Sequence, residues 1–259
     1  MHPLTAAAVA LAVLFFASWL VSIPLRNVSI IDIVWGLAFV TSSVAALLSA
    51  PEIRVRHVVT TMLVVVWGVR LTVHLALRNH GAGEDFRYAA MRRRIGPTFW
   101  WKSLARVFLV QAIAAWLVSL PVMLAASDSS DDAFDLLVVI GASVWLVGFA
   151  FESIGDLQLV RFKANPHNQG AVLQHGLWRY TRHPNYFGDS IVWWGIFITS
   201  VARPRGWFGL VGPLLMTFLL VRVSGVALLE KSLHKRKPEY AAYVARTAAF
   251  VPRRPRSTP

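Results

Sequence analysis

Long apolar runs recur along the chain and limit what it can fold into. A helix needs about 20 residues to cross roughly 30 Å of hydrocarbon, and each run is close to that length. The runs fall near 4–23, 30–50, 57–77, 104–126, 134–155, 187–202 and 207–229. Because backbone polar groups inside lipid must be satisfied by the protein itself, these spans should be helices. The sequence therefore predicts an all-α, polytopic membrane protein, a bundle of about seven transmembrane helices.

Composition agrees with this class. Of the 259 residues, 56% are hydrophobic and 15% are charged, which would leave too much apolar surface exposed in a soluble domain. No small-residue cleavage site and soluble domain follow the first run, so we interpret it as a retained span rather than a signal peptide. With no internal repeat or linker, we expect one integral membrane domain over 1–259. The lack of cysteine excludes disulfides and thiolate chemistry.

The net charge of +13 is concentrated in a few connections rather than spread over a nucleic-acid-binding face. This pattern is typical of cytoplasmic loops, whereas the acidic connection 127–132 is expected on the opposite side of the membrane. We expect an outside N-terminus, a cytoplasmic C-terminus and a bacterial inner membrane. The bilayer is then the partner, and nucleic acid is not. The basic residues of these connections are Arg78, Arg87, Arg92, Arg93, Arg94, Lys102 and Arg106, then Arg161, Lys163, Arg179 and Arg182, then Lys231, Lys235, Arg236, Lys237, Arg246, Arg253, Arg254 and Arg256.

The segment Gly176–Asp189, GLWRYTRHPNYFGD, is the most polar and aromatic stretch that leads directly into an apolar run. Arg179, Arg182 and His183 offer hydrogen-bond donors, and Asn185 can donate and accept. Guanidinium groups in this arrangement favour a large anionic cofactor held where a membrane helix begins. The alternative is a basic and aromatic anchor at the membrane interface.

Asp32 places a carboxylate near the start of the second run, where a charge needs a partner or a role. It can act as a proton donor or polarise a carbonyl. The alternative is a helix N-terminal cap formed by Ser29 or Asp32.

The third run carries polar residues on one helical face, which should point inward. Arg70 is the predicted ion-pair partner of Asp32. The pair would either form part of a ligand site or only stabilise the structure. A lone histidine without a second one at metal spacing predicts no metal site. The face consists of Trp67, Arg70, His74, Leu77 and Arg78.

The connection Asn79–Tyr88 is too mixed for a simple linker. Gly81 and Gly83 permit close backbone approach to a ligand, and Glu84 and Asp85 can accept from hydroxyls. The alternative is a solvated, positively charged loop. The glycines are not a dinucleotide fingerprint, because no strand precedes them.

Two further pairs are expected to face a cavity. Glu152 and Asp156 are four residues apart and share a helical face, where they can hold ribose hydroxyls or amides. Arg222 and Glu230 lie just over two turns apart. Tyr243, in the tail, either anchors the chain at the membrane interface or closes a cofactor pocket.

Together, these segments resemble the steroid 5-alpha-reductase family, and most of all its bacterial branch. The resemblance rests on Gly176–Asp189, 152–163, 228–231, 238–252 and the Gly83–Tyr88 block. It covers nearly the whole chain and is most specific in the C-terminal half.

The resemblance implies a seven-helix enzyme whose cytoplasmic half encloses NADPH, while an apolar lipid or steroid-like substrate enters from the bilayer. Hydride would pass to an electron-poor carbon of an enone. Catalysis is assigned to Asp32, Arg70 and Tyr88, with no metal. Cofactor binding is assigned to Asn79, Glu152, Asp156, Arg161, Lys163, Arg179, His183, Asn185, Asp189, Arg222, Glu230 and Tyr243.

The chain departs from the steroid enzymes where those hold the ketone. It lacks their Gln-Glu pair in the second span, Trp67 stands at the position of their third-span tyrosine, and Glu152 replaces their asparagine. Because tryptophan donates one hydrogen bond but cannot deliver a proton, we hypothesise that Tyr88 is the donor.

Two other functions fit parts of the sequence. The Arg182–Tyr186 stretch and the terminal acid Glu230 also resemble isoprenylcysteine carboxyl methyltransferases and phospholipid methyltransferases, which bind S-adenosylmethionine. A lipid-binding or transport protein would use Asp32, Arg70 and Asp156 as an ion pathway. The absence of repeated halves disfavours transport, and the abundance of arginine favours the reductase.

Overall fold

The predicted fold class is confirmed by a computed structural model of the chain. It describes residues 1–128, 136–201, 206–223, 225–226, 229–230 and 239–256. Within these ranges the regular structure is helical and contains no strand. Six helical stretches are long and apolar enough to cross a membrane. They are Pro3–Leu25, Ile30–Leu48, Val55–Asn79, Phe86–Val118, Leu136–Ala164 and Gly206–Val223.

The remaining predicted span forms helix α9 (Pro184–Ser200), which has 17 residues and is not one of those six. Several predicted features lie outside the described residues. They are Asp131 and Asp132 of the acidic connection, Leu228, Pro238, and the basic residues Lys231, Lys235, Arg236 and Lys237. The orientation in the membrane stays a prediction.

The described helices group into two compact units. Unit 1 comprises Met1–Val138 and Ile196–Gly212, and unit 2 comprises Val139–Gly195 and Pro213–Pro259. Each unit is described by itself below, and the single-domain prediction stays a prediction.

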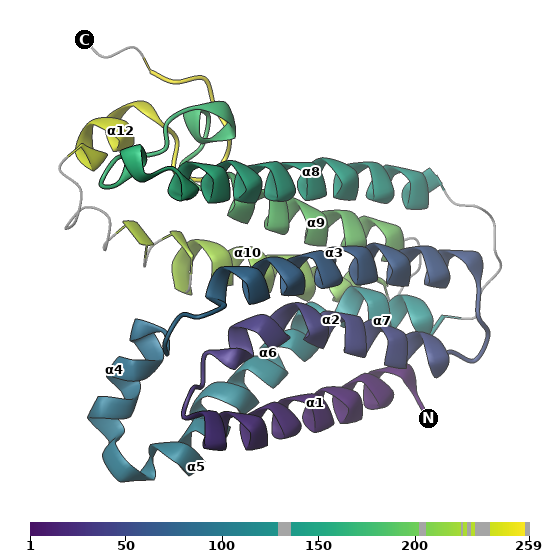
Figure 1. Cartoon of the computed structure of the whole chain (residues 1–259). Helices are drawn as coiled ribbons and strands as arrows, with labels where there is room; N and C mark the ends of the chain where they lie inside the picture. The colour runs from purple at the N-terminus through teal and green to yellow at the C-terminus, as the bar shows by residue number, and fades with distance from the viewer. Residues whose placement is uncertain (129–135, 202–205, 224, 227–228, 231–238, 257–259) are drawn as a thin grey trace. The chain divides into compact units, whose positions relative to one another are not determined.

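Unit 1 is built on three long helices, with α2 packed between α1 and α3 (Figure 1). Its helices are α1 (Pro3–Leu25), α2 (Ile30–Leu48), α3 (Val55–Asn79), α4 (Phe86–Ile95), α5 (Phe99–Ser103), the π-helical η2 (Leu104–Leu109), α6 (Val110–Val118) and α7 (Leu120–Ala126). Helices α2 and α3 approach closely because Gly36 faces Gly68. A Cβ added at Gly68 would lie 2.7 Å from the Gly36 carbonyl oxygen.

Unit 2 is built around the close pair α8 (Leu136–Ala164) and α9. A Cβ at Gly188 of α9 would lie 2.6 Å from the Gly148 carbonyl oxygen of α8, and one at Gly195 would lie 2.5 Å from the Trp145 nitrogen. Small residues allow this approach, as in membrane helix pairs generally. The other elements are η3 (Pro166–Asn168), η4 (Gly176–Arg179), α10 (Val211–Phe218), the π-helical η6 (Leu219–Val223) and α12 (Tyr240–Arg246).

The glycine contact between α8 and α9 gives a stability prediction. Gly188→Ala should destabilise the purified protein by about 1–3 kcal/mol, because the added methyl group meets rigid backbone. The measurement is the unfolding midpoint in detergent. Gly83→Ala is the matched control, since a Cβ there meets nothing within 4 Å. Equal midpoints for the two variants would contradict the close packing.

Candidate functional site

The polar end of unit 1 surrounds Asp32, near the start of α2. Helices α4 and α5 lie at this end, where α1 ends and α2 begins (Figure 1). Asp32 Oδ2 accepts a hydrogen bond of 2.9 Å from Arg87 Nη2, and its Oδ1 accepts one of 2.9 Å from the Tyr88 hydroxyl. The partners that the structure shows for Asp32 thus come from α4, which folds over the start of α2, and the predicted pairing with Arg70 stays a prediction.

Asp85 fixes Arg87 from the other side. The Asp85 carboxylate accepts from the Arg87 Nε at 2.8 Å and from the Arg87 amide at 2.9 Å, so it also caps α4. Burial of Asp85 opposes ionisation, but these bonds outweigh it and lower the pKa of Asp85. The Asp85 amide donates to the Ser29 hydroxyl at 2.6 Å. Ser29 makes no side-chain cap on α2, so the capping interpretation is wrong for this residue.

Glu84 ties α4 to the turn between α1 and α2. Arg92 donates to both Glu84 carboxylate oxygens, at 2.8 and 2.7 Å, and the Val28 amide donates at 2.9 Å. Burial again opposes ionisation, yet the hydrogen bonds from Arg92 and Val28 lower the pKa of Glu84. Glu84 and Asp85 thus accept hydrogen bonds from Val28, Arg87 and Arg92 of the same chain. The segment Asn79–Tyr88 is therefore more than a solvated loop.

The hydroxyl of Tyr88 lies between two polar partners at this end of unit 1. Tyr88 is 7% exposed, donates to Asp32 and accepts a bond of 3.2 Å from Gln111 Nε2 of α6. Gln111 was missed from the sequence. Its signal was a lone amide within the apolar run 104–126, where a polar side chain needs a partner.

The predicted polar face of α3 runs from the core of unit 1 to its surface. Trp67 is fully buried, Arg70 and His74 are half-buried, and Arg78 is exposed. At the end of the helix, Arg78 Nε donates to the Asn79 side-chain oxygen at 3.2 Å. Asn79 therefore contacts its own neighbour.

In unit 2, two predicted acids are buried on α8, as expected. Glu152 is 2% and Asp156 is 5% exposed. Asp156 Oδ1 accepts a bond of 3.0 Å from the Asn185 side-chain amide, which joins the first turn of α9 to α8. Asn185 Oδ1 is buried and has no hydrogen-bond partner among the described residues. Asp189, one turn further along α9, is also buried.

Glu230 is held by the residues just before α9. Its Oε1 accepts from Arg182 Nε at 2.7 Å and contacts His183 Nε2 at 3.3 Å. Burial opposes ionisation of Glu230, but bonds from His183 and Arg182 prevail and lower its pKa. The His183 ring stacks on Tyr186 at a centroid distance of 5.6 Å. Arg222, in η6, is exposed.

Arg182 and Tyr243 lock the C-terminal tail to unit 2. The buried guanidinium of Arg182 donates to the Thr247 carbonyl at 2.5 Å and the Val244 carbonyl at 3.3 Å. The Tyr243 hydroxyl donates to the Trp178 carbonyl at 2.5 Å. Tyr243 is 2% exposed, so it is a packing residue rather than an exposed anchor at the membrane interface. Burial raises its pKa.

The predicted phosphate-binding residues are on the surface. Arg161 and Lys163 lie in the last turn of α8, Arg179 ends η4, and all three are exposed. Exposed cations can bind an anion from solution at a lower desolvation cost than buried ones.

The fold and these sites define an integral, multi-pass, all-α membrane protein with a cluster of hydrogen-bonded polar residues in each unit. The model of the family described as a protein of unknown function, DUF1295, matches residues 18–247, and the chain belongs to that family. No curated protein and no solved structure matches the chain.

The cluster around Glu230 predicts an acid-sensitive tail. Because its folded-state pKa is lowered, Glu230 stabilises the fold above its ordinary pKa of 4.5, and this contribution is lost as pH falls through the folded value. Solvent screening keeps it to roughly 0.5–1 kcal/mol. Stability in detergent, measured from about pH 6 to about pH 3, should fall less in Glu230→Gln than in the wild-type protein.

The matched control is Glu239→Gln, which removes an exposed carboxylate that makes no side-chain cap on α12. This variant should lose stability as the wild-type protein does. The assignment to Glu230 would be contradicted if both variants behaved alike.

Proposed function

We propose that this protein is a membrane-embedded, NADPH-dependent reductase that transfers a hydride to the carbon-carbon double bond of a lipid or steroid-like enone. The observation that carries the proposal is the Tyr88 hydroxyl, held between Asp32 and Gln111. The resemblance of the C-terminal half to the steroid 5-alpha-reductase family supports the same chemistry.

Reduction of an enone needs a hydrogen-bond donor at the ketone oxygen, because negative charge develops there as the hydride is added. Tyr88 can supply that donor, whereas Trp67 cannot release a proton. Since Gln111 donates to the Tyr88 oxygen, the single phenolic proton is left to an acceptor, either Asp32 or a substrate oxygen. Arg87 fixes this group, because it pairs with Asp32 and its guanidinium lies 5.3 Å from the Tyr88 ring centroid.

The residues of unit 2 fit the binding of a dinucleotide. The buried acceptor oxygen of Asn185 suits an N–H group such as a carboxamide, and Asp156 fixes the orientation of that side chain. Exposed Arg161, Lys163 and Arg179 suit phosphate groups. NADPH, when bound, supplies the hydride.

One alternative has an observation in its favour. The three buried carboxylates of unit 2, Glu152, Asp156 and Asp189, also suit a cationic donor such as the sulfonium of S-adenosylmethionine. A methyltransferase of the isoprenylcysteine carboxyl type is therefore the second proposal.

The nature of the bound cofactor separates the two proposals. Mass spectrometry of the purified, denatured protein should detect NADP(H), and Asn185→Ala should weaken NADPH binding by about 1–3 kcal/mol through the lost hydrogen bonds. Gln169→Ala, which removes an exposed amide, is the control and should bind normally. Detection of S-adenosylmethionine instead, with no affinity for NADPH, would overturn the reductase proposal.

Tyr88→Phe tests the chemistry separately. With a 3-oxo-4-ene steroid as the probe, we expect kcat to fall about 10²–10⁴-fold, the usual contribution of a positioned acid, while NADPH affinity is unchanged. Tyr180→Phe, at an exposed tyrosine, is the control. Unchanged turnover in Tyr88→Phe would rule out Tyr88 as the donor.

A further inference from the structure

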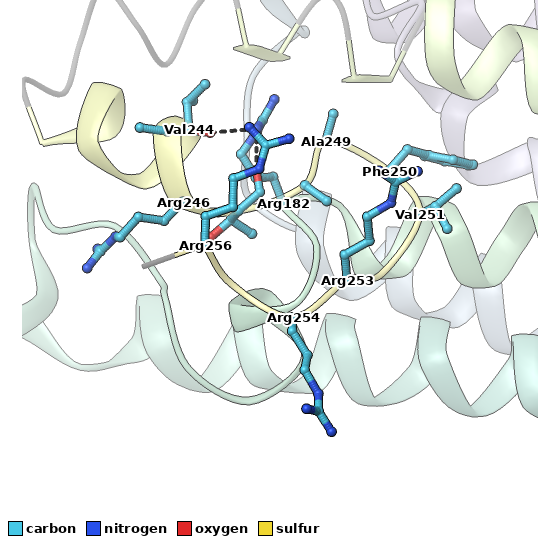
Figure 2. Close-up of a pocket in the computed structure, with 12 residues that line it drawn as sticks. Arg182, Val244, Arg246, Ala249, Phe250, Val251, Arg253, Arg254 and Arg256 are labelled. Carbon is cyan, nitrogen blue, oxygen red and sulfur yellow. Dashed lines mark hydrogen bonds between the residues drawn. The ribbon is translucent and has the colours of Figure 1, made fainter. Parts of the chain in front are cut away.

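A pocket of about 440 Å³ lies in unit 2, between Arg182 and the chain that follows α12. Five arginines line it, and none of the described residues in its lining is acidic: Arg182, Arg246, Arg253, Arg254 and Arg256. Figure 2 shows Arg182 reaching the carbonyl group of Val244, while the Arg254 side chain extends outward from the tail. All the charged side chains among the described residues of the lining are therefore positive.

The five arginines divide by what occupies their guanidinium groups. Arg182 binds Glu230 and two carbonyls, and Arg246 donates to the Gln174 side-chain oxygen. Arg253, Arg254 and Arg256 are exposed, and their guanidiniums make no hydrogen bond or ion pair within the described part of the chain.

The backbone, rather than those side chains, holds the tail in place. The Arg253 amide donates to the Tyr180 carbonyl at 3.0 Å, and the Arg256 amide donates to the Arg246 carbonyl at 3.0 Å. The backbone is thus held at Arg253 and Arg256, on either side of Arg254, while the guanidinium donors of all three stay available. Such guanidiniums suit the oxygens of a phosphate, which they can bind in a bidentate manner.

Apart from the arginines and Thr247, the described residues of the lining are apolar. Val244, Ala248, Ala249, Phe250 and Val251 contribute to it, and Val251 is 52% exposed. Arg182 lies two residues before Pro184, where the apolar helix α9 begins. A phosphate attached to an apolar body would use both parts of this lining, whereas a free phosphate would use the arginines alone.

We infer that this pocket binds the headgroup phosphate of an anionic phospholipid. Arg253 and Arg256 contact the phosphate, the outward-pointing Arg254 adds positive charge beside it, and Phe250 and Val251 contact the glycerol and the first acyl carbons. Clustered basic residues next to a membrane helix attract anionic lipid by the same electrostatics. The inference is independent of the reductase proposal.

Lipid binding by the full-length protein in detergent tests this site. Native mass spectrometry would measure the affinities of phosphatidylglycerol and phosphatidylcholine. The variant Arg253→Gln/Arg254→Gln/Arg256→Gln should lose the preference for phosphatidylglycerol by at least about tenfold. The matched control Arg93→Gln/Arg94→Gln/Arg106→Gln removes three exposed arginines outside the pocket and should keep that preference.

Three results would overturn the inference. Equal loss in both triple variants would mean general charge attraction only. Displacement of phosphatidylglycerol by inorganic phosphate at matched concentration would mean a simple anion site. Weakened binding of NADP⁺ with intact binding of phosphatidylglycerol in the tail variant would mean a dinucleotide subsite. Circular dichroism of each variant should show unchanged helix content.

Discussion

The pairing of half-buried charges is the constraint on which the polar end of unit 1 depends. A carboxylate placed at the start of an apolar helix costs solvation energy, which only a close cation and further hydrogen bonds can offset. Arg87 provides both for Asp32 while it is itself held by Asp85. Glu84 and Arg92 repeat the arrangement beside it. The position of α4 follows from these contacts, and so does the place of the Tyr88 hydroxyl.

In unit 2 the corresponding role belongs to Arg182. This one buried guanidinium links Glu230 to the carbonyls of Val244 and Thr247, so the segment before α9 and the C-terminal tail are held together. The sequence suggested Arg182 as one of the residues that hold a cofactor, yet its guanidinium donates to acceptors within the protein. The arginines that keep available donors lie further along the tail, where the sequence indicated only a cytoplasmic charge excess.

Much of the candidate site could be predicted because intramembrane polar residues are rare and each needs a reason. That argument selected Asp32, Glu152 and Asp156; in the structure Asp32 and Asp156 accept hydrogen bonds, and Glu152 is buried. It did not find Arg87 as a partner of Asp32, since helical spacing on α3 pointed to Arg70 while Arg87 lies on α4. It also overlooked Gln111, because a single uncharged amide hardly changes the hydropathy of a long apolar run. Periodicity shows which residues share a face of one helix. It does not show which side chain of another helix lies opposite that face.

The sequence by itself determined that the chain is a set of apolar helices, because hydrocarbon leaves the backbone no other way to satisfy its hydrogen bonds. It also determined which residues are too costly to be placed without a partner. Only the tertiary structure decided which partner each one has, and how closely α2 meets α3 and α8 meets α9. Those outcomes depend on where glycines let two backbones approach and where a short helix such as α4 turns back, and both arise from packing between segments far apart along the chain.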